Sequence, residues 1–489
     1  MINHIFEILK ISSTNHLDSK NFYPATHILG SSLYEVCGLE ITKIDSYISI
    51  PFSILYILSM YILAKKISSD NKFSLLVSLA SAIPVTGSYG IGFYPANIST
   101  LLLPLTLYII YLFSNIKNKI SSKICAVTII LLYPLIHPLT SVILIGILLL
   151  LYAIESIYGT NMILSLTKKH YTHIKRINVE IIFILFITFI SWFSMFSVWA
   201  LKIREIYNII FTDTVSPLSD TLELANKVQF SIFDIFELMV KMQGGALIYA
   251  SIAIILAFVY LKQNNTQEEY LEIRENIFAI FAFLLLIVVF QLIVILFPTG
   301  IDTFRPLRYT VIFTTILLGL AVFIKNNTSK KETSIKVVAF TSIFGILIGL
   351  SIMSYPSPYQ FTPNPQITYQ DIAGTKWIEE NKNQNSEIIG IWPYSTYVNV
   401  LAILEKEIKS MNKLYISRTS DHFGYDTNNS IAKTYNSDTY LPIFEYDRDT
   451  QLVLWYEAEH FYKEDFQKLS RDSSVDLIYE NGETEVWKV

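Results

Sequence analysis

Long apolar segments recur along most of the chain, and they constrain its fold more than any other feature. Ten of them are long enough, or nearly long enough, to cross a bilayer: residues 46–64, 73–89, 98–113, 124–135, 139–158, 179–201, 246–261, 277–297, 307–324 and 335–353. A spanning helix needs roughly 20 mostly apolar residues, because the hydrocarbon core is about 30 Å thick. Only 16% of the residues are charged, whereas soluble domains carry about 25%. The sequence therefore predicts a polytopic α-helical membrane bundle of about ten spans.

Basic side chains predict the orientation of this bundle. They gather in the loops after the odd-numbered segments, at Lys65, Lys66, Lys72, Lys117, Lys119, Lys123, Lys168, Lys169, Lys175, Arg176, Lys262, Arg274, Lys325, Lys330, Lys331 and Lys336. Loops rich in Lys and Arg stay in the cytoplasm. We therefore expect a multi-pass protein of the cell membrane whose two ends lie outside. The alternation requires 124–135 and 139–158 to be separate segments, which predicts a helical hairpin around Pro134 and Pro138.

Three regions follow from this pattern. Residues 1–44 are expected to form an outer-face loop with interfacial helices, residues 45–354 the membrane bundle, and residues 355–489 a small extracytoplasmic α/β domain. Residues 202–245 form a long outer loop, and its segment 220–242 is amphipathic. This segment is expected either to lie in the membrane interface or to pack on the bundle.

The C-terminal domain follows a linker rich in proline and aromatic residues. We expect helices at 371–381, 398–409 and 461–469, and strands at 387–391, 414–417 and 476–479. Asn481-Gly482 is typical of a hairpin turn and precedes a last strand at 485–489.

Composition excludes several classes of function. The net charge of -4 gives no indication of nucleic-acid binding. Cys37 and Cys125 form neither a disulfide framework nor a metal-binding pattern. No glycine-rich phosphate loop, zinc-protease or nucleophile-elbow motif stands in a matching context. Membrane lipid is the first expected partner.

Polar residues gather in the N-terminal loop, at His4, Glu7, His16, Asp18, Tyr23 and His27. His4 and Glu7 are one turn apart if the segment is helical. A carboxylate beside a histidine suits a general base or a metal ligand. Glu7, Asp18 and His27 are therefore catalytic candidates, and His4 and Glu7 are metal candidates. The alternative is an interfacial helix whose polar face meets water.

Three further groups lie on the predicted outer side. His137 stands at the turn of the hairpin, where it faces either a cleft or solvent, and it is a fourth catalytic candidate. Arg305, Arg308 and Tyr309 precede a span where the positive-inside rule disfavours arginine. They are expected either to clamp a lipid phosphate or to pair with Asp302 and anionic head groups.

The third group is Asp421, His422 and Tyr425 in the C-terminal domain. A histidine flanked by aspartate and aromatic residues suits contact with a sugar or a metal. The alternative is a structural turn with Gly424 in the left-handed region.

The order of these motifs resembles the GT-C superfamily of membrane glycosyltransferases, and within it an archaeal branch. The resembling pieces are NFYPATHIL (21–29), HPLT (137–140), RPLRY (305–309), YPSPY (355–359), NPQITYQDIAGTKW (364–377) and DHFGY (421–425). The resemblance implies transfer of a sugar from a polyprenyl-phosphate donor on the outer membrane face, in cell-envelope or protein glycosylation. It also implies an acid in the first outer loop that acts as base or as ligand to a divalent cation such as Mg or Mn. A later basic residue, Arg305 or Arg308, would hold the lipid phosphate.

The beginning of the chain departs from that family. Its first visible span runs inward, so a preceding span and the acidic part of the first outer loop are expected to be missing. Glu7 and Asp18 are then the remaining carboxylates of the loop, and neither matches the family position. Two other functions compete with an enzyme. One is a non-catalytic membrane protein that binds lipid-linked glycan or an envelope partner, and the other is a transporter, which lacks clear inverted repeats and charges within the spans.

Overall fold

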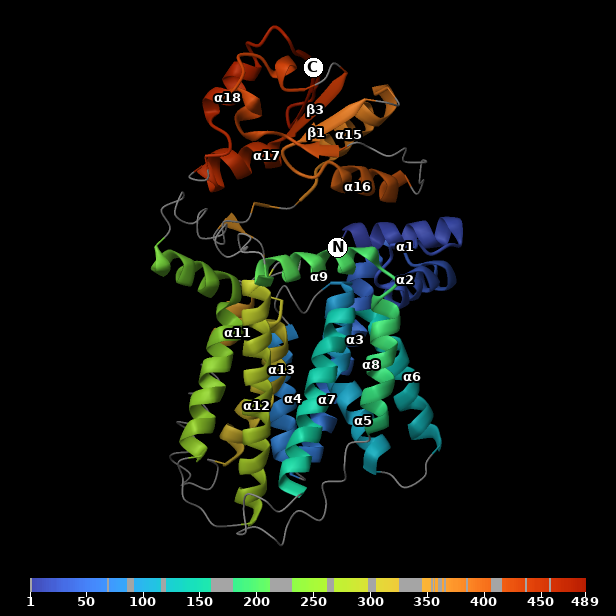
Figure 1. The fold of residues 1–489 in the computed structure, drawn as a ribbon, viewed down its shortest axis with the longest axis vertical. Helices are drawn as coiled ribbons and strands as arrows, with labels where there is room; N and C mark the ends of the chain where they lie inside the picture. Colours follow the sequence, from blue (N-terminus) through green and yellow to red (C-terminus); the bar gives the residue numbers. More distant parts are fainter. Residues whose placement is uncertain are drawn as a thin grey trace.

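A computed structural model describes residues 2–67, 70–85, 92–115, 120–159, 179–211, 231–261, 268–297, 305–324, 345–352, 355, 357, 358, 363, 364, 366–383, 386–405, 416–435, 438–456 and 459–489. Most of these residues are helical, and a small sheet lies near the C-terminus. The long helices stand side by side, and a mixed domain lies beyond one end of them (Figure 1). The fold is thus a helical bundle followed by a small α/β domain, as predicted.

The bundle contains most of the long helices. They are α3 (Ile44–Ile67), α4 (Asn71–Val85), α5 (Pro95–Asn115), α6 (Ile120–Ile136), α7 (Pro138–Gly159), α8 (Val179–Phe193), α11 (Ile232–Leu261), α12 (Glu268–Leu296) and α13 (Leu307–Ile324). A single residue, His137, separates α6 from α7, so the predicted hairpin is present. Pro134, however, lies inside α6, and the turn depends on Pro138 alone.

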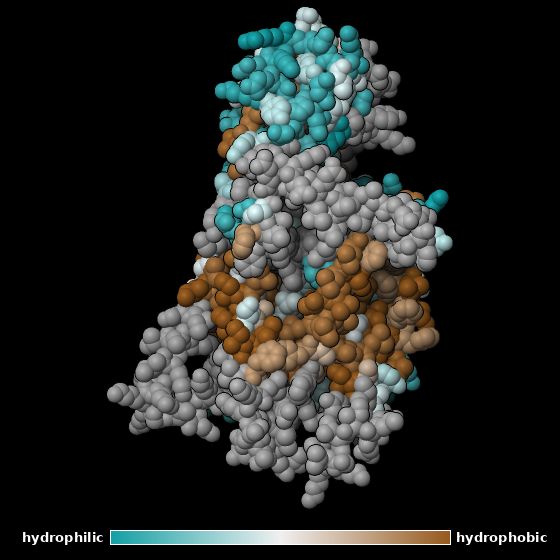
Figure 2. Space-filling model, turned by 60° about the vertical axis from the view of Figure 1, so that its left-hand side comes forward, coloured by the Kyte–Doolittle hydropathy of each residue, from teal (hydrophilic) through white to brown (hydrophobic). Residues whose placement is uncertain are grey.

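The surface of the bundle is that of a protein embedded in a membrane. Along α3, Ile50, Ile54 and Leu58 follow helical spacing and are each more than half exposed. Polar side chains such as Ser81 and Thr315 are buried instead. Hydrophobic side chains cover the outside of the bundle, whereas the C-terminal domain is mostly hydrophilic (Figure 2). An extended apolar outer surface of this kind needs an apolar solvent or a partner.

Two helical segments of the described residues, Tyr47–Ile67 and Pro95–Phe113, are long and apolar enough to cross a membrane by length and composition. Six shorter apolar helical segments of 10–17 residues accompany them. The count is below the ten spans that the sequence predicts. The 15-residue helices α4 and α8 illustrate the difference, since a helix rises only about 1.5 Å per residue.

Two predicted segments differ in the structure. The sixth span, 179–201, ends at Phe193, and α9 (Ser197–Phe211) then lies across the end of the bundle (Figure 1). Of the amphipathic segment 220–242, residues 220–230 lie outside the described part. The remainder opens α11 and is continuous with the seventh predicted span.

Gly319 on α13 is where the bundle packs most closely against α4. A Cβ atom built at Gly319 would lie 2.3 Å from Cγ2 of Val77, which is fully buried. Alanine in place of a helical glycine gains about 1 kcal/mol of helix propensity, but overpacking against a stiff β-branched side chain costs about 1–3 kcal/mol. We expect Gly319→Ala to lower the thermal unfolding midpoint in detergent.

The double variant Gly319→Ala/Val77→Ala is expected to recover part of that loss, because it removes the colliding methyl groups. Gly349, in the helix over 345–352, has open space around its Cα, so Gly349→Ala is the matched control and should leave the midpoint unchanged or raise it. Equal midpoints for Gly319→Ala and the wild type would contradict the close packing.

The C-terminal domain is a five-stranded mixed sheet with helices on both faces. Its elements are α15 (Tyr369–Asn381), β1 (Glu387–Gly390), α16 (Ser395–Glu405), β2 (Ile416–Arg418), β3 (Thr439–Phe444), α17 (Glu445–Asp449), α18 (Lys463–Leu469), β4 (Asp476–Glu480) and β5 (Thr484–Lys488). The strand order is β2-β1-β3-β5-β4. β1 is parallel to β2 and β3, and the other pairs are antiparallel.

Successive residues of β1 pack into two separate hydrophobic cores, because successive side chains of a strand point to opposite faces of the sheet. Ile388 packs with Ile378 of α15, whereas Ile389 packs with Phe466 of α18. The predicted helices and strands of the domain all coincide with observed elements, but β3 and α17 were not predicted.

The N-terminal helices α1 (Ile2–Thr14) and α2 (Pro24–Cys37) lie across the end of the bundle that faces the C-terminal domain (Figure 1). α16 rests on α1: Ile403 joins a buried cluster with Ile5 and Ile8. Asn399 Nδ2 of α16 also donates a 3.0 Å hydrogen bond to Asn3 Oδ1 of α1. α1 is therefore packed against the bundle and the C-terminal domain at once.

Candidate functional site

Four helices have a proline at their first residue or directly before it, and a polar or aromatic residue precedes each proline. The pairs are Tyr23-Pro24 at α2, Tyr94-Pro95 at α5, His137-Pro138 at α7 and Arg305-Pro306 before α13. Proline suits the first turn of a helix because its missing N–H has no partner there anyway. It also keeps the preceding residue out of the helical region. Each of the four side chains is thus held at the beginning of a helix by its local sequence.

These four helix starts meet at one place, with His4 of α1 among them. The ring of Tyr23 stacks on His137, with centroids 5.5 Å apart and planes inclined by 18°. His4 meets Tyr23 edge to face at 5.7 Å and Tyr94 at 6.1 Å. We call His4, Tyr23, Tyr94, His137 and Arg305 the helix-start cluster.

Arg305 is the cation of this cluster. Its Nε is buried without a hydrogen-bond partner, and the guanidinium makes no ion pair with any described residue. Burial lowers the pKa of His137 to about 3, and the charges of Arg305 and Arg308 add to this effect. Arg305 also contributes to the lowered pKa of His4, after burial and His27. The guanidinium therefore lies within electrostatic reach of both imidazoles.

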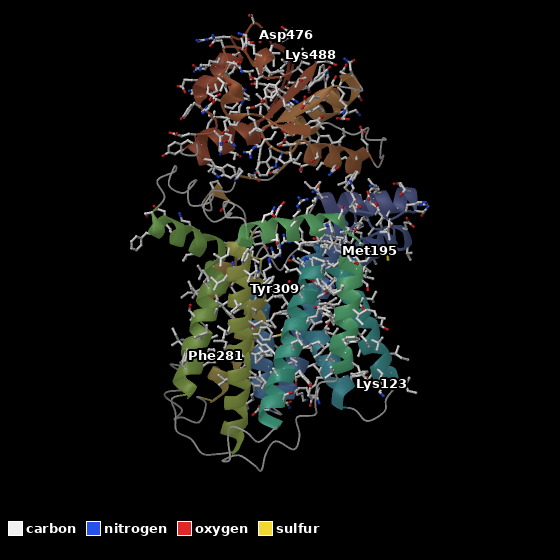
Figure 3. The ribbon with its side chains drawn as sticks, in the orientation of Figure 1. Lys123, Met195, Phe281, Tyr309, Asp476 and Lys488 are labelled. Atoms are coloured by element: carbon white, nitrogen blue, oxygen red, sulfur yellow. The ribbon has the colours of Figure 1, made fainter. Side chains whose placement is uncertain are left out.

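Arg308 and Tyr309 lie one turn further along the same helix. Arg308 Nη1 donates to Oδ1 of the buried Asn97, at 3.2 Å. The hydroxyl of Tyr309 is 2.7 Å from Thr140 Oγ1, which in turn lies 2.8 Å from His137 Nδ1. Tyr309 is almost completely buried inside the bundle, near the end that faces the C-terminal domain (Figure 3). Tyr309 is thus linked to His137 through the hydroxyl of Thr140.

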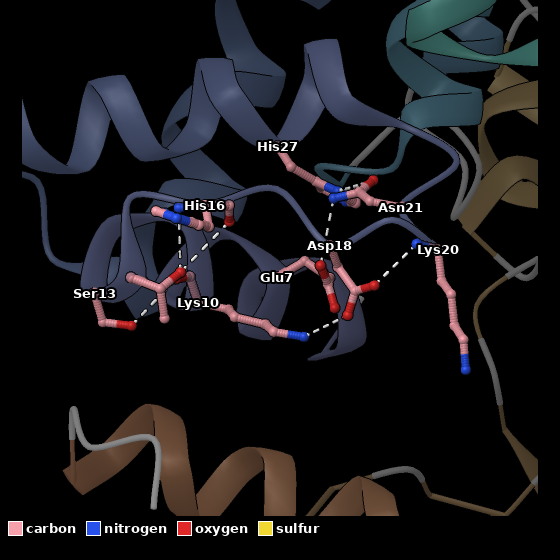
Figure 4. A network of polar contacts seen from close by, with 9 residues as sticks. Glu7, Lys10, Ser13, His16, Asp18, Lys20, Asn21 and His27 are labelled. Carbon is pink, nitrogen blue, oxygen red and sulfur yellow. Dashed lines mark hydrogen bonds and ion pairs between the residues drawn. The ribbon is translucent and has the colours of Figure 1, made fainter. Parts of the chain in front are cut away.

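A second set of hydrogen bonds joins the cluster to the N-terminal loop, and Figure 4 shows its members Glu7, Asn21 and His27. His4 Nδ1 lies 3.0 Å from His27 Nε2, and His27 Nδ1 lies 2.9 Å from Asn21 Oδ1. Asn21 Nδ2 donates to Glu7 Oε2 at 3.3 Å. Burial raises the pKa of the Glu7 carboxyl, although Lys10 opposes this. His4, His27, Asn21 and Glu7 therefore form one continuous chain of contacts.

Asp18 lies outside the helix-start cluster. Its carboxylate pairs with Lys10 at 2.6 Å and accepts a hydrogen bond from the backbone N–H of Lys20 at 2.9 Å. The hydrogen bond from Lys10 is the main reason that the pKa of Asp18 is lowered. This pair anchors the loop between α1 and α2. The catalytic role predicted for Asp18 stays a prediction.

The group predicted in the C-terminal domain is held by partners within that domain. Asp421 pairs with His460 at 3.0 Å, and His422 pairs with Asp465 at 2.8 Å. The hydroxyl of Tyr425 donates to Asp472 at 3.0 Å. Gly424 has a φ of 80°, as the alternative of a structural turn requires, and His422 itself has a φ of 53°. Contact of this group with a substrate stays a prediction.

The helix-start cluster has the chemistry of an anion site. Three of its helices, α2, α5 and α7, bring the positive end of the helix dipole to the cluster at their beginnings. The α13 start adds Arg305, whose planar fork matches the oxygens of phosphate or sulfate. The neutral imidazoles of His4 and His137 add no competing charge. A single anionic group therefore has both charge and donors in reach.

The fold is similar to that of a solved oligosaccharyltransferase. A search of solved structures matches the chain to the oligosaccharyltransferase of Archaeoglobus fulgidus, in a crystal structure of its complex with Zn and sulfate. The TM-score is 0.54 at 12% sequence identity, with 96% of this chain and 66% of that chain covered. The chain thus spans just under two thirds of the length of that protein. No family model and no curated protein matches the sequence.

A likeness at this identity shows a shared fold, so the GT-C-like architecture expected from the motifs is supported. The finer expectation of a missing first span is not addressed by it. The roles of the individual side chains rest on the geometry of this chain alone.

A divalent cation does not fit the described part of this site. Among the described residues, no three His, Cys, Asp or Glu side chains come together as metal ligands. His4 and Glu7, the predicted ligands, stand at opposite ends of the hydrogen-bond chain through His27 and Asn21.

Sequence reasoning missed Asn21, Tyr94, Asn97 and Thr140 as members of the site. A signal for Tyr94 was present, because Tyr94-Pro95 repeats the pattern of Tyr23-Pro24 and His137-Pro138. Asn97 and Thr140 follow those prolines by two residues and hence lie in the first turn of their helices. The pattern of an aromatic or basic residue followed by proline at a helix start is common to all four starts.

Acid is expected to loosen α1 from α2, because burial lowers the pKa of His27 to about 4 and that of His4 to about 3. The unfolded chain takes up these protons near pH 6.5, so the folded state loses stability as pH falls from about 6.5 towards 4. Hydrogen exchange of α1 amides, corrected for intrinsic rates, should show more frequent opening, by up to about tenfold per pH unit for each histidine.

The variant His27→Gln should flatten this pH dependence, whereas His16→Gln, at an exposed position of the same loop, should leave it unchanged. An opening rate of α1 that stays constant between pH 7 and pH 4.5 would show that the buried imidazoles do not contribute.

Proposed function

We propose that this protein is a GT-C-type membrane glycosyltransferase that takes its sugar from a polyprenyl-phosphate donor at the outer membrane face. The observation that carries the proposal is the helix-start cluster. Arg305, with a buried Nε that has no partner among the described residues, lies where the starts of α2, α5, α7 and α13 meet. The similarity of the fold to an oligosaccharyltransferase supports the same class of enzyme.

The position of the cluster suits a lipid-linked ligand. It lies at one end of an apolar bundle, so a polyprenyl tail can remain in lipid while its phosphate reaches Arg305. Exposed apolar side chains of the bundle, such as Leu131 and Val142 on α6 and α7, provide the lipid-facing surface near His137. Phosphate contact by Arg305 is the part of the proposal that the geometry supports most directly.

The proposed orientation follows from the distribution of charge. Lys123, near the beginning of α6, lies at the end of the bundle opposite to the N-terminal helices (Figure 3). The positive-inside rule then puts the helix-start cluster and the C-terminal domain outside the cell membrane. We propose that the C-terminal domain, which rests on α1, presents the acceptor to the site.

The test is a transfer assay with the full chain in lipid nanodiscs. Citronellyl phosphate carrying radiolabelled glucose serves as donor, and membrane extract of the host serves as acceptor. Transfer of label that needs Arg305 supports a glycosyltransferase. Saturable donor binding without transfer supports the alternative, a non-catalytic protein that binds lipid-linked glycan. Absence of donor binding would overturn both.

A further inference from the structure

The side-chain amide of Asn21 has one orientation only. Its Oδ1 accepts a hydrogen bond from the backbone N–H of Tyr23 at 3.0 Å, and a backbone N–H can only donate. Its Nδ2 lies 3.3 Å from the carboxylate of Glu7, which accepts. A flipped amide would place oxygen against oxygen and nitrogen against N–H. Asn21 is also 93% buried, with 7% of its surface exposed, so water does not replace these partners.

This orientation determines the tautomers of two histidines. Because Asn21 Oδ1 is an acceptor, the nitrogen that faces it, His27 Nδ1, carries a proton. His27 is neutral, as its lowered pKa requires. Its Nε2 is then a bare acceptor and takes the Nδ1–H of His4 at 3.0 Å. His4, also neutral, is left with an unprotonated Nε2.

The bare Nε2 of His4 has no hydrogen-bond partner among the described residues. The ring lies against Tyr23 and Tyr94, within the electrostatic reach of Arg305. His137 has the opposite tautomer, since the backbone N–H of Thr140 donates to its Nδ1 at 3.3 Å and leaves the proton on Nε2. The helix-start cluster therefore contains one imidazole acceptor and one imidazole donor.

A lone pair beside Arg305 restricts what the anion site can hold. The oxygens of a phosphodiester are acceptors and would repel the lone pair of His4 Nε2. A ligand that fills the site must therefore bring a hydrogen-bond donor close to its phosphate. In a sugar linked to a polyprenyl phosphate, the phosphate carries no proton, and the donors are the hydroxyls of the sugar.

We propose that Asn21 is a positioning residue that holds His27 and His4 in their Nδ1–H tautomers, so that His4 Nε2 accepts a hydroxyl of the sugar whose phosphate Arg305 binds. This inference rests on the proposed function and deepens it. The site would then recognise a glycosyl phosphate with a free hydroxyl, and it would discriminate against a phosphate ester of the same shape without one.

The tautomers are tested directly by the ring ¹⁵N shifts of the full chain labelled with ¹⁵N-histidine. His4 and His27 of the wild type should both show a protonated Nδ1 and a bare Nε2. Asn21→Leu removes the acceptor for His27 and should convert both rings to mixtures of tautomers. A wild-type protein in which His4 carries its proton on Nε2 would overturn the proposal, whatever the variant does.

Specificity is tested by equilibrium binding of three probes: glucose 1-phosphate, cyclohexyl phosphate and inorganic phosphate. Cyclohexyl phosphate keeps the six-membered ring and lacks every hydroxyl. In Asn21→Leu the preference for glucose 1-phosphate over cyclohexyl phosphate should fall by about fivefold, as one neutral hydrogen bond predicts. An unaltered preference would contradict the role of Asn21.

The double variant Glu7→Gln/Asn21→Asp exchanges the amide and the carboxylate. The new carboxylate still accepts from His27 and from the backbone N–H of Tyr23, and the new amide donates to it. Both tautomers and the preference for glucose 1-phosphate should return to wild-type values. Failure of this exchange to restore either would argue against tautomer control.

The outcome for Arg305 separates this inference from the proposed function. If Arg305→Gln leaves the binding of inorganic phosphate intact, the anion site itself is wrong. If Arg305→Gln abolishes phosphate binding while Asn21→Leu keeps the sugar preference, only the role of Asn21 is wrong.

Discussion

Replacing Arg305 with glutamine is expected to weaken the binding of citronellyl phosphate by roughly tenfold to hundredfold, since a charge-assisted hydrogen bond contributes about 1.5–3 kcal/mol. No described carboxylate pairs with Arg305, and its Nε lies buried without a partner. The substitution therefore removes a ligand contact and no ion pair seen among the described residues. Titration calorimetry of the full chain in detergent measures the change.

Arg204→Gln, at an exposed position of α9, is the matched control and should bind like the wild type. Arg305→Lys should give an intermediate affinity, because lysine keeps the charge but not the planar fork. The unfolding temperatures of the three variants should agree. Equal affinities of Arg305→Gln and Arg204→Gln would remove Arg305 from the site.

Asp447 is expected to make the C-terminal domain less stable as pH rises. Burial raises the pKa of this carboxyl to about 7, with Asp371 adding to the shift and the backbone N–H of Phe444 opposing it. The folded state therefore holds a proton that the unfolded chain loses near pH 4, so stability falls between about pH 4 and pH 7. The full loss is on the order of 4 kcal/mol.

Asp447→Asn should remove that trend, so its effect on stability relative to the wild type should change sign with pH. At pH 8 the substitution removes a buried charge. At pH 5 the carboxyl is neutral, and the substitution only puts an amide NH2 group at the position of Oδ1, which has no partner among the described residues. An unsatisfied buried donor costs about 1–3 kcal/mol. Hydrogen exchange of β3 amides in the full chain should therefore show stabilisation at pH 8 and destabilisation at pH 5. Asp426→Asn, at an exposed position, is the control. Parallel pH profiles for Asp447→Asn and the wild type would refute the effect.

Within the described residues, hydropathy was enough to locate the helices of the bundle but not to count the spans, since α4 and α8 are only 15 residues long. The hairpin at His137 follows from Pro138 alone. The end of α8 could not be found in this way. The chain leaves the helix at Ser194 and Met195, where no proline or glycine marks the break. Contacts of α9 across the end of the bundle decide it: Phe193 stacks on Trp199 with centroids 4.3 Å apart.

In the C-terminal domain the missing strand was the central one. β3 contains Pro442, and proline is normally confined to edge strands because it cannot donate a ladder hydrogen bond. In the structure Pro442 lies opposite Val486 of β5, and every residue of β3 is buried. Burial on both faces keeps this strand in the centre of the sheet, which no local pattern reveals.

At the candidate site the sequence was most informative where the position of a single residue in the chain is unusual by itself. Arg305 was expected to matter because an arginine at the outer end of a span needs a partner, and His137 because it stands at a turn. Asn21 offered no such reason. Its importance arises from three contacts, with Glu7, Tyr23 and His27, and only the folded loop brings their polar atoms to the two ends of one amide.

The packing of α1 between the bundle and the C-terminal domain has a mechanical consequence. His4 of α1 belongs to the helix-start cluster. The same helix also contacts α16, through Ile5, Ile8 and the Asn3–Asn399 hydrogen bond. A helix behaves as a stiff rod over such a length. A tilt of the C-terminal domain against the bundle would therefore also turn α1, and with it the imidazole of His4, so that α1 couples the two halves of the molecule.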